Sequence, residues 1–258
     1  MNVRRSTLIV CLALAFSRLC FAQEITVATA ADLQFAMEDI AKQFQKETGK
    51  NVKLIFGSSG SFFQQIQNGA PFDIFFSANL DYAKKLESAG LTEPGSFYQY
   101  AKGRIVIWVL KDSKLDLSSG LRSLLNPSIK KIAIANPQHA PYGQAAVASM
   151  QKEGIYDQVK DKFVLGENIS QAASFVVSGS ADVGIVALSL ALSPTMRDKG
   201  RYVEIQSTEY PPIEQASVIL RSSKNKEAAR QFLAFIKTAT VSETFKRYGF
   251  DVPGASKP

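Results

Sequence analysis

The sequence has few of the residues on which thiol, imidazole or metal chemistry depends. Its 258 residues include two cysteines and one histidine, and both cysteines, Cys11 and Cys20, lie near the N-terminus. No group of His, Cys and carboxylate residues has the spacing of a metal site. Apart from one N-terminal segment, no apolar run approaches the roughly 18 residues of a membrane-spanning helix. These scarcities argue against a thiol enzyme, a metalloprotein and an integral membrane protein.

Residues 1–22 have the three parts of a secretory signal peptide. Arg4 and Arg5 precede a short apolar run at 8–16, and Ala22 ends a small-x-small cleavage site. The alternative is an uncleaved N-terminal anchor, for which the run is short. Cleavage after Ala22 leaves 236 residues without cysteine, which excludes disulfides although export would permit them. Cleavage also removes three arginines and no acidic residue, so the formal charge falls from +7 to +4.

The remaining basic residues do not form a nucleic-acid site. They are interspersed with acidic residues, as where Lys84 and Lys85 are followed by Glu87, and this mixing is typical of solvated helix faces. A nucleic-acid groove would need a basic stripe with interleaved aromatic residues. With 46% hydrophobic and 21% charged residues, the composition is that of an ordinary globular protein of one or two domains. We therefore expect no nucleic-acid partner.

From residue 25 onward, short β-rich runs alternate with amphipathic helical stretches. This alternation predicts an α/β fold with mainly parallel sheet, and several runs are apolar at consecutive positions, as in strands covered on both faces. An apolar stripe over 33–44 predicts a helix that ends at Gly49, and further helices are expected after Gly143 and over 232–236. The expected strands are 25–30, 52–57, 73–78, 104–110, 131–136, 163–166, 183–188, 202–205 and 216–220.

Four expected strands are followed by turns that begin helices. These turns cover residues 29–32, 57–61, 137–143 and 167–170, and they are rich in small and hydroxyl-bearing residues. In open α/β sheets, ligands bind at the carboxyl ends of strands. The first N–H groups of a helix lack intrahelical acceptors, and the helix dipole favours negative charge there. The pattern therefore favours an anion site, with plain helix capping by Ser, Thr, Asp and Asn as the alternative.

His139 raises the one enzymatic alternative, an exported hydrolase in which it would activate Ser59. The run 57–61 is not a phosphate-binding loop, because no Gly-Lys-Ser/Thr follows it. It is not a nucleophile elbow either, because Ser61 stands where the last glycine is required. A histidine in a loop is more often structural. We therefore expect a binding protein that is not an enzyme and has no catalytic residue.

Five motifs, in order along the chain, resemble the periplasmic molybdate/tungstate-binding proteins of ABC importers over residues 24–252. The resemblance implies a two-lobed type II periplasmic binding protein, each lobe a mixed, mainly parallel sheet flanked by helices. It implies lobe one at 23–106 plus 214–258 and lobe two at 107–213, with hinge-crossing strands near 104–110 and 216–220. The motifs are Ile-Thr-Val-Ala-Thr-Ala-Ala-Asp-Leu (25–33), Phe-Gly-Ser-Ser-Gly (56–60), Gln-Asn-Gly-Ala-Pro-Phe-Asp-Ile-Phe-Phe-Ser-Ala (67–78), Ile-Ala-Asn-Pro-Gln-His-Ala-Pro-Tyr-Gly (134–143) and Phe-Lys-Arg-Tyr-Gly-Phe (245–250).

The resemblance also implies a ligand and partners. Such proteins hold a tetrahedral dianion, molybdate or tungstate, between the lobes by hydrogen bonds alone, with no directly coordinated metal and no cofactor. They deliver it to the permease and ATPase of an importer, and a monomer in the periplasm is expected. The ligand contacts carried over to this sequence are Ala31, Ser58, Ser59, Tyr142 and Ile169.

Two further ligand-binding positions depart from the family pattern. Asp32 stands where a serine hydroxyl usually binds the anion, and Ala187 stands where many members have a tyrosine, which Tyr142 could replace from the facing turn. A carboxylate about 4 Å from one unit of charge costs about 4 kcal/mol at an effective dielectric near 20. Either Asp32 caps its helix and points away, or the ligand carries a donor. The second case would favour a protonated oxyanion or a small polar organic ligand.

Overall fold

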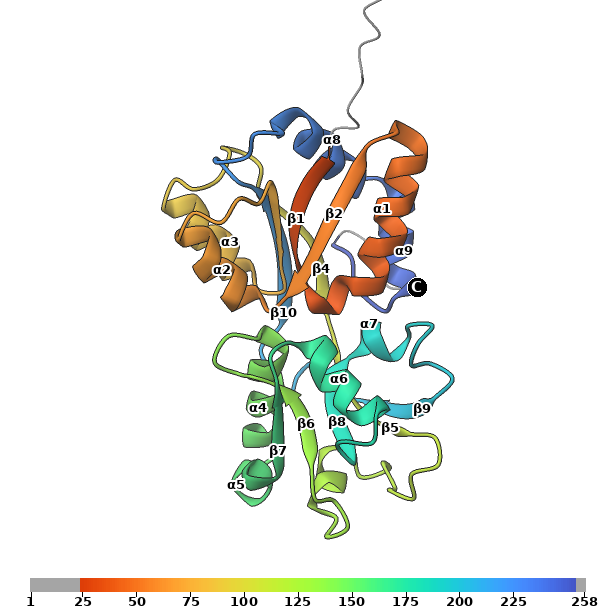
Figure 1. The fold of residues 1–258 in the computed structure, drawn as a ribbon. Coiled ribbons are helices and arrows are strands. Elements are labelled where there is room, and N and C mark those ends of the chain that lie inside the picture. Colours follow the sequence, from red (N-terminus) through yellow and green to blue (C-terminus); the bar gives the residue numbers. More distant parts are fainter. Residues whose placement is uncertain (1–23, 254–258) are drawn as a thin grey trace, which may run out of the picture.

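The computed structural model describes residues 24–253, which form two lobes built on two five-stranded sheets (Figure 1). The expected α/β fold, with mixed sheets flanked by helices in two lobes, is confirmed. The sheets are not mainly parallel as expected, because each combines two parallel with two antiparallel pairings. The expected signal peptide at 1–22 lies outside the described residues. Within 24–253, no helix is long and apolar enough to cross a membrane.

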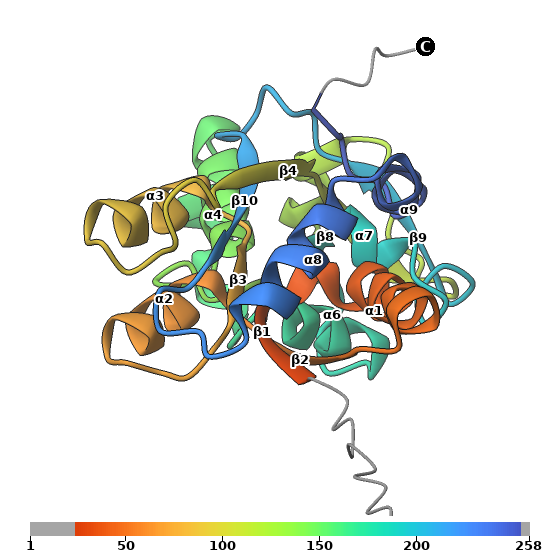
Figure 2. The same ribbon diagram turned by 90° about the horizontal axis from the view of Figure 1, so that it is seen from above.

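The first sheet has the strand order β2-β1-β3-β10-β4 and lies between two layers of helices. Seen from above, α2 and α3 lie on one side and α1, α8 and α9 on the other (Figure 2). Alternate side chains of β3 face these layers, since Phe75 packs with Phe62 of α2 and Phe76 packs with Phe232 of α8. The elements are β1 (Glu24–Ala30), β2 (Asn51–Gly57), β3 (Ile74–Ser77), β4 (Tyr98–Gly103), β10 (Ile213–Ile219), the 3₁₀ turn η1 (Ala31–Leu33), α1 (Gln34–Thr48), α2 (Ser59–Gln67), α3 (Leu80–Ser88), α8 (Lys226–Ile236) and α9 (Ala239–Arg247).

The second sheet has the order β7-β6-β8-β5-β9. Its crossovers β6–α4–β7 and β7–α6–β8 run in opposite directions across the sheet, so right-handed connections place α4 and α6 on opposite faces. The elements are β5 (Ile105–Leu110), β6 (Ile132–Ala135), β7 (Phe163–Gly166), β8 (Val183–Ala187), β9 (Gly200–Glu204), α4 (Pro141–Lys152), α5 (Tyr156–Val159), α6 (Ile169–Val177), α7 (Leu188–Ala191) and the 3₁₀ segments η2 (Gly120–Leu125) and η3 (Lys160–Lys162).

The chain passes between the two sheets twice, at Arg104 and over residues 205–212. The strands expected to cross the hinge instead lie wholly within one sheet each, β5 in the second and β10 in the first. Strand β4 was not expected, because its sequence is polar at several positions; it pairs with β10 in an antiparallel ladder. The lobe bounds at 106/107 and 213/214 stay a prediction.

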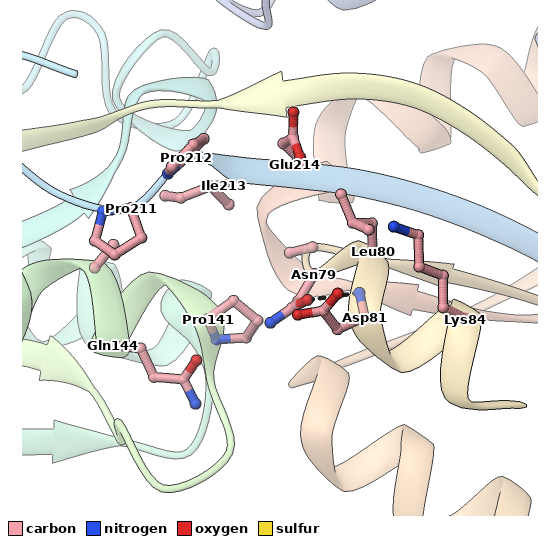
Figure 3. Close-up of a pocket in the computed structure, with 12 residues that line it drawn as sticks. Asn79, Leu80, Asp81, Lys84, Pro141, Gln144, Pro211, Pro212, Ile213 and Glu214 are labelled. Atoms are coloured by element: carbon pink, nitrogen blue, oxygen red, sulfur yellow. Dashed lines mark hydrogen bonds between the residues drawn. The ribbon is translucent and has the colours of Figure 1, made fainter. Parts of the chain in front are cut away.

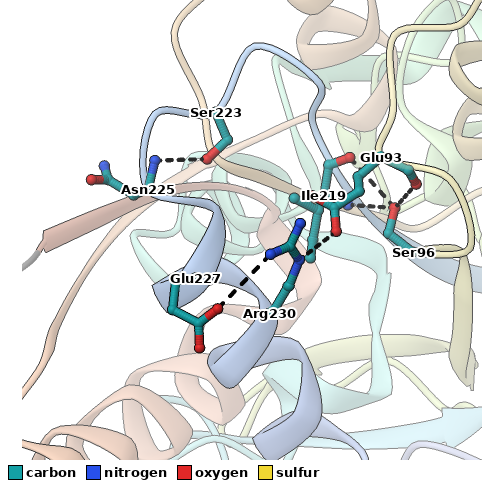
Figure 4. Close-up of polar contacts among 7 residues, drawn as sticks. All are labelled: Glu93, Ser96, Ile219, Ser223, Asn225, Glu227 and Arg230. Carbon is teal, nitrogen blue, oxygen red and sulfur yellow. Dashed lines mark hydrogen bonds and ion pairs between the residues drawn. The ribbon is translucent and has the colours of Figure 1, made fainter.

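Polar contacts fasten the start of α8 and the chain before β4 to the first sheet (Figure 4). Arg230 of α8 donates from Nε to the Glu93 carboxylate at 2.6 Å. Ser96 Oγ donates to the Glu93 carbonyl at 2.6 Å and accepts from the Ile219 N–H of β10 at 3.1 Å. The C-terminal helices are thereby part of the first lobe, next to the strand that returns from the second.

Both sheets have the topology that creates a ligand crevice. In the first, β2 and β3 lie on opposite sides of β1, and in the second, β7 and β8 lie on opposite sides of β6. Successive crossovers therefore diverge at the carboxyl ends of β1 and β6, which leaves a gap between adjacent loops. In the assembled molecule these two ends face each other across the interlobe boundary, so the loops after β1, β2, β6 and β7 converge (Figure 1).

Candidate functional site

A small cavity lies where the loops of the two lobes meet. Three segments of the first lobe and two of the second form its wall, and most of the side chains are small. No lysine or arginine is among these described lining residues. They are Ala30, Ala31, Asp32, Gly57, Ser58, Ser59, Ala78, Ala140, Pro141, Tyr142, Asn168 and Ile169.

The expected ligand contacts come together at this cavity with one exception. Ala31, Asp32, Ser58, Ser59, Tyr142 and Ile169 all line it. Ala187 does not: it ends β8, is fully buried and lies outside the cavity wall. The cavity therefore does not extend to the position where the family resemblance implied a tyrosine.

Local sequence explains why helices begin at this cavity. Ser58 precedes α2 and its Oγ accepts from the Ser61 N–H at 3.4 Å, while Asn168 precedes α6 and its Oδ1 accepts from the Gln171 N–H at 3.0 Å. Helix α4 starts with Pro141, whose fixed φ suits the first helical position. Capping uses the N–H groups of the third helical residues, so the first N–H groups of α2 and α6 stay available to a ligand.

The two serines that follow β2 differ in what their hydroxyls do. Ser59 Oγ accepts from the Ala78 N–H at 2.9 Å, and its own proton has no acceptor among residues 24–253. Ser58 Oγ donates to Ser61 Oγ at 2.8 Å and lies 2.8 Å from His139 Nδ1. Ser59 thus has a hydroxyl proton free to donate into the cavity, whereas Ser58 is engaged within the protein.

Direct hydrogen bonds join the lobes around the cavity. The Gly60 N–H of α2 donates to the His139 carbonyl at 2.9 Å, and Ser170 Oγ of α6 donates to the Ala31 carbonyl at 2.9 Å. Ser189 Oγ of α7 donates to the Asp32 carbonyl at 2.7 Å. A glycine is required at position 60, because a Cβ there would lie 2.6 Å from the His139 carbonyl oxygen. The lobes are therefore closed on each other.

Asp32 is at the centre of a buried polar network that spans both lobes. Its Oδ2 accepts from Gln215 Nε2 of β10 at 2.7 Å and from the Tyr142 hydroxyl of α4 at 2.9 Å. The Tyr100 hydroxyl of β4 donates to Gln215 Oε1 at 2.8 Å, which orients the amide so that its nitrogen faces Asp32. Asp32 Oδ1 is equally buried but has no hydrogen-bond partner within the described residues.

Burial dominates the electrostatics of this network. Desolvation raises the pKa of Asp32 to about 6, although the hydrogen bonds from Gln215 and Tyr142 lower it. Desolvation also raises the pKa of Tyr142 well above its usual value, and the nearby Asp32 adds to the rise. The tyrosine is thus a neutral donor, while Asp32 changes its charge near neutral pH.

These contacts decide two questions that the sequence left open. Asp32 does not cap a helix, because neither η1 nor α1 has a side-chain cap, and it lines the cavity instead of pointing away. The Tyr142 hydroxyl does not replace the missing tyrosine donor in this arrangement, because its one proton is donated to Asp32. The backbone N–H of Tyr142 remains at the cavity wall.

The Ser59–His139 pair of the enzymatic alternative is not formed. His139 Nδ1 contacts Ser58 rather than Ser59, and its Nε2 lies 3.5 Å from the exposed Glu167 carboxylate. Ser59 Oγ is bonded to a backbone N–H instead. A metal centre has no candidate within residues 24–253, where no group of three or more His, Cys, Asp or Glu residues is positioned to hold an ion.

A second interlobe cavity opens on the side of the residue 205–212 crossing (Figure 3). Asn79, Asp81 and Lys84 of the α3 region line one part of it and Gln144 of α4 another, and Pro211 and Pro212 lie on the side of the crossing. Asn79 Oδ1 accepts from the Asp81 N–H at 2.8 Å, as an ordinary helix cap. The polar groups of this second cavity do not converge on one point, in contrast to those of the cavity lined by Asp32 and Ser59.

Several residues of the site had no local signal in the sequence. Gln215 and Tyr100 lie 183 and 68 positions from Asp32 and reach it only because β10 and β4 pair in the first sheet. Ser170 joins the lobes from the expected turn at 167–170, whereas Ser189 does so from α7, a helix that was not predicted. Long-range strand pairing, rather than a motif, places them.

Comparisons with known proteins agree over nearly the whole chain. The family model described as bacterial extracellular solute-binding protein matches residues 25–251. The chain is 40% identical to the Molybdate-binding protein ModA of Azotobacter vinelandii over 233 residues, which is 90% of this chain and 92% of that protein. It is 36% identical to ModA of Rhodobacter capsulatus, covering 89% and 88%. The solved structure of the Azotobacter vinelandii periplasmic molybdate-binding protein superposes with a TM-score of 0.84 at 35% identity, covering 89% and 99%.

Proposed function

The chain belongs to the bacterial extracellular solute-binding protein family, and we propose that it captures a small tetrahedral oxyanion between its lobes for an ABC importer. The observation that carries the proposal is the convergence of helix starts from both lobes on one closed cavity. Unpaired first-turn N–H groups and helix dipoles stabilise an anion without a charged side chain.

Molybdate or tungstate is the first ligand to test, because the matched relatives are named for molybdate. The ligand contacts that we propose are the Ser59 hydroxyl and the backbone N–H groups of the Ala31, Ser58, Tyr142 and Ile169 turns. Asp32 is the remaining side chain at the ligand. Ala187 is not proposed, because it lies outside the cavity wall.

Capture would couple to a motion of the lobes. Ligand contacts come from both lobes, so an occupied cavity favours the closed arrangement over an open one. The two segments that join the sheets, Arg104 and residues 205–212, are the proposed hinge. Export through residues 1–22 with cleavage after Ala22, a monomeric state, and delivery to the importer's permease and ATPase complete the proposal.

The carboxyl group of Asp32 favours a second candidate function, in which the same fold binds a different class of ligand. A carboxylate that stayed ionised beside the ligand would accept a hydrogen bond rather than donate one. A ligand with a donor of its own, such as a protonated oxyanion or a small hydroxyl- or amine-bearing molecule, would then fit better than molybdate. Comparing hydrogen phosphate with molybdate separates the two candidates.

Calorimetric titration of the chain from residue 23 onward with molybdate, tungstate, sulfate and hydrogen phosphate tests the proposal. We expect saturable binding of molybdate and tungstate at one site, and no binding of any of the four ions at micromolar protein would refute it. Ser59→Ala should weaken molybdate binding by about ten- to a hundredfold, because a hydrogen bond to a charged group contributes about 1.5–3 kcal/mol. Ser178→Ala, an exposed serine at the end of α6, is the matched control and should bind as the wild type does.

A further inference from the structure

The two carboxylate oxygens of Asp32, which lines the cavity, differ in their hydrogen bonding. Oδ2 accepts two hydrogen bonds, from Gln215 and Tyr142, while Oδ1 has no partner within residues 24–253. The residue is 2% exposed and lines the cavity, so bulk water does not compensate the free oxygen. A buried polar atom without a partner at a ligand site points to a group that is completed by the ligand.

An ionised Asp32 cannot complete this site with a dianion. It would add a negative charge next to the ligand, and Oδ1 would face an anion oxygen with no proton between them. A neutral carboxyl group satisfies both the protein donors at Oδ2 and the anion at Oδ1. Its carbonyl oxygen Oδ2 keeps the two bonds from Gln215 and Tyr142, and its Oδ1 hydroxyl becomes a donor to the anion.

We propose that Asp32 is a specificity-determining residue that binds the oxyanion as a neutral acid, with its Oδ1–H donating to the ligand, so that capture takes up one proton from solvent. The inference rests on the proposed function and concerns the same cavity. The proton balance is simple: one proton leaves the buffer, joins Oδ1 as the anion enters, and returns when the anion leaves. A fully deprotonated anion is preferred, because hydrogen phosphate would bring its own O–H against the O–H of Asp32.

The surroundings of Asp32 support a neutral bound form. The groups that face it are Gln215 of β10, Tyr100 of β4 and Tyr142 of α4, and Ser189 of α7 uses its hydroxyl on the backbone carbonyl. The two tyrosines are neutral donors, and no cation among the described residues contributes to the titration of Asp32. Burial already raises the pKa of Asp32 to about 6 without ligand, and a dianion raises the pKa further.

One other titratable pair lies at the cavity rim and needs a control. His139 contacts Ser58 through Nδ1 and lies near the Glu167 carboxylate through Nε2. A protonated His139 would also favour an anion at low pH. The variant His139→Gln removes this charge while leaving Asp32 in place, so its pH profile isolates the contribution of the carboxyl group.

The test is calorimetric titration with molybdate at pH 6, 7 and 8, in pairs of buffers with different heats of ionisation. The wild type should take up close to one proton at pH 8. Its Kd should be about fiftyfold higher at pH 8 than at pH 6, because only the protonated form binds. A group with a pKa of about 6 is half protonated at pH 6 and about 1% protonated at pH 8. His139→Gln should keep this slope, whatever its absolute affinity.

Asp32→Asn is the decisive variant, because its amide supplies a permanent donor in place of Oδ1 and an acceptor in place of Oδ2. It should bind molybdate without proton uptake, with a pH-independent Kd that is at least tenfold tighter than the wild type at pH 8. Thermal unfolding checks that the variant is folded, and the proton count of the wild type tests the proposal without any variant.

Three results would overturn the inference while leaving the proposed function intact. They are molybdate binding without proton uptake in the wild type, a pH slope that is lost in His139→Gln but kept in Asp32→Asn, and a folded Asp32→Asn that no longer binds molybdate. Absence of binding by wild type and variants at every pH would instead refute the proposed function itself.

Discussion

Replacing Asp32 by asparagine should stabilise the ligand-free protein at neutral pH and do so less at acidic pH. The folded state holds this carboxyl group at a pKa of about 6, against an ordinary value of 3.8, because burial disfavours its charge. Between these two values the folded state binds more protons than the unfolded state, so the stability contributed by the protonated group is complete below 3.8 and is lost as pH rises through 6.

The magnitude follows from the size of the pKa shift. At 1.36 kcal/mol per pKa unit, ionised Asp32 destabilises the fold by about 3 kcal/mol at pH 7.5 and by about half that at pH 5. Asparagine avoids this cost and keeps an acceptor for Gln215 and Tyr142. Its amide nitrogen, however, takes the place of Oδ1, where no partner lies within residues 24–253, at a cost of about 1 kcal/mol. We expect a net gain of about 2 kcal/mol at pH 7.5.

The comparison between the two pH values is the sharper quantity. The cost of burying the asparagine amide is the same at both, so the stability difference between variant and wild type should shrink by about 1 kcal/mol from pH 7.5 to pH 5. Urea unfolding measures it, followed by far-UV circular dichroism and by the fluorescence of Trp108, the single tryptophan, which is buried in the second lobe. Coincident transitions establish that both lobes unfold together.

Asp73→Asn is the matched control, since Asp73 is the other buried aspartate of the first lobe. Its Oδ2 accepts from the Thr26 N–H at 2.8 Å and its Oδ1 from the Ser223 hydroxyl at 2.6 Å. An amide can replace only one acceptor, so this variant should lose about 1–3 kcal/mol at both pH values. If Asp32→Asn were destabilised as well, or its effect did not change with pH, the reasoning about buried charge at Asp32 would be wrong.

Two further substitutions probe closure of the lobes. Gly60→Ala places a Cβ 2.6 Å from the His139 carbonyl oxygen of the other lobe, so it should hinder closure of the lobes. It should weaken molybdate binding at least tenfold with little change in melting temperature. Gln64→Ala, on the exposed side of α2, is the control and should change neither the affinity nor the melting temperature. Tyr142→Phe removes a hydrogen bond that lowers the pKa of Asp32 and also joins the lobes. The Asp32 titration, followed by carbon NMR, should therefore move to higher pH, and the radius of gyration of the ligand-free protein should increase. A titration that stayed in place would contradict the assigned hydrogen bond.

The parts of the fold that follow from local sequence were predictable. Alternating apolar runs and helical stripes mark β1, β2 and β3 of the first sheet, and Gly49 ends α1 in the left-handed conformation with φ of 71°. The turns after β1, β2, β6 and β7 were identified because parallel strands direct their carboxyl ends to one edge. Strand β4 was not predicted, because Gln99 and Lys102 interrupt its apolar pattern and only its pairing with β10 defines it.

The roles of side chains at the site were less predictable, for a physical reason. The contacts that decide what Asp32 and Tyr142 do come from Gln215 and Tyr100, whose strands pair only after the chain has returned from the second lobe. Motif spacing carries no information on such contacts, because they depend on sheet order and on the closed arrangement of the lobes. The enzymatic alternative paired His139 with Ser59, and the contact with Ser58 was not predicted for the same reason.

The absence of basic side chains from the described cavity wall gives Asp32 its importance. A site lined by lysine or arginine would absorb one extra negative charge with little loss of affinity for a dianion. In the proposed function, the attraction comes from oriented N–H groups and one serine hydroxyl, which carry partial charges only. An ionised carboxylate in that wall would offset several of these contributions at once. If the proposal is right, the protonation state of Asp32 determines whether the cavity attracts or rejects a dianion, and the pH dependence of the affinity measures that state directly.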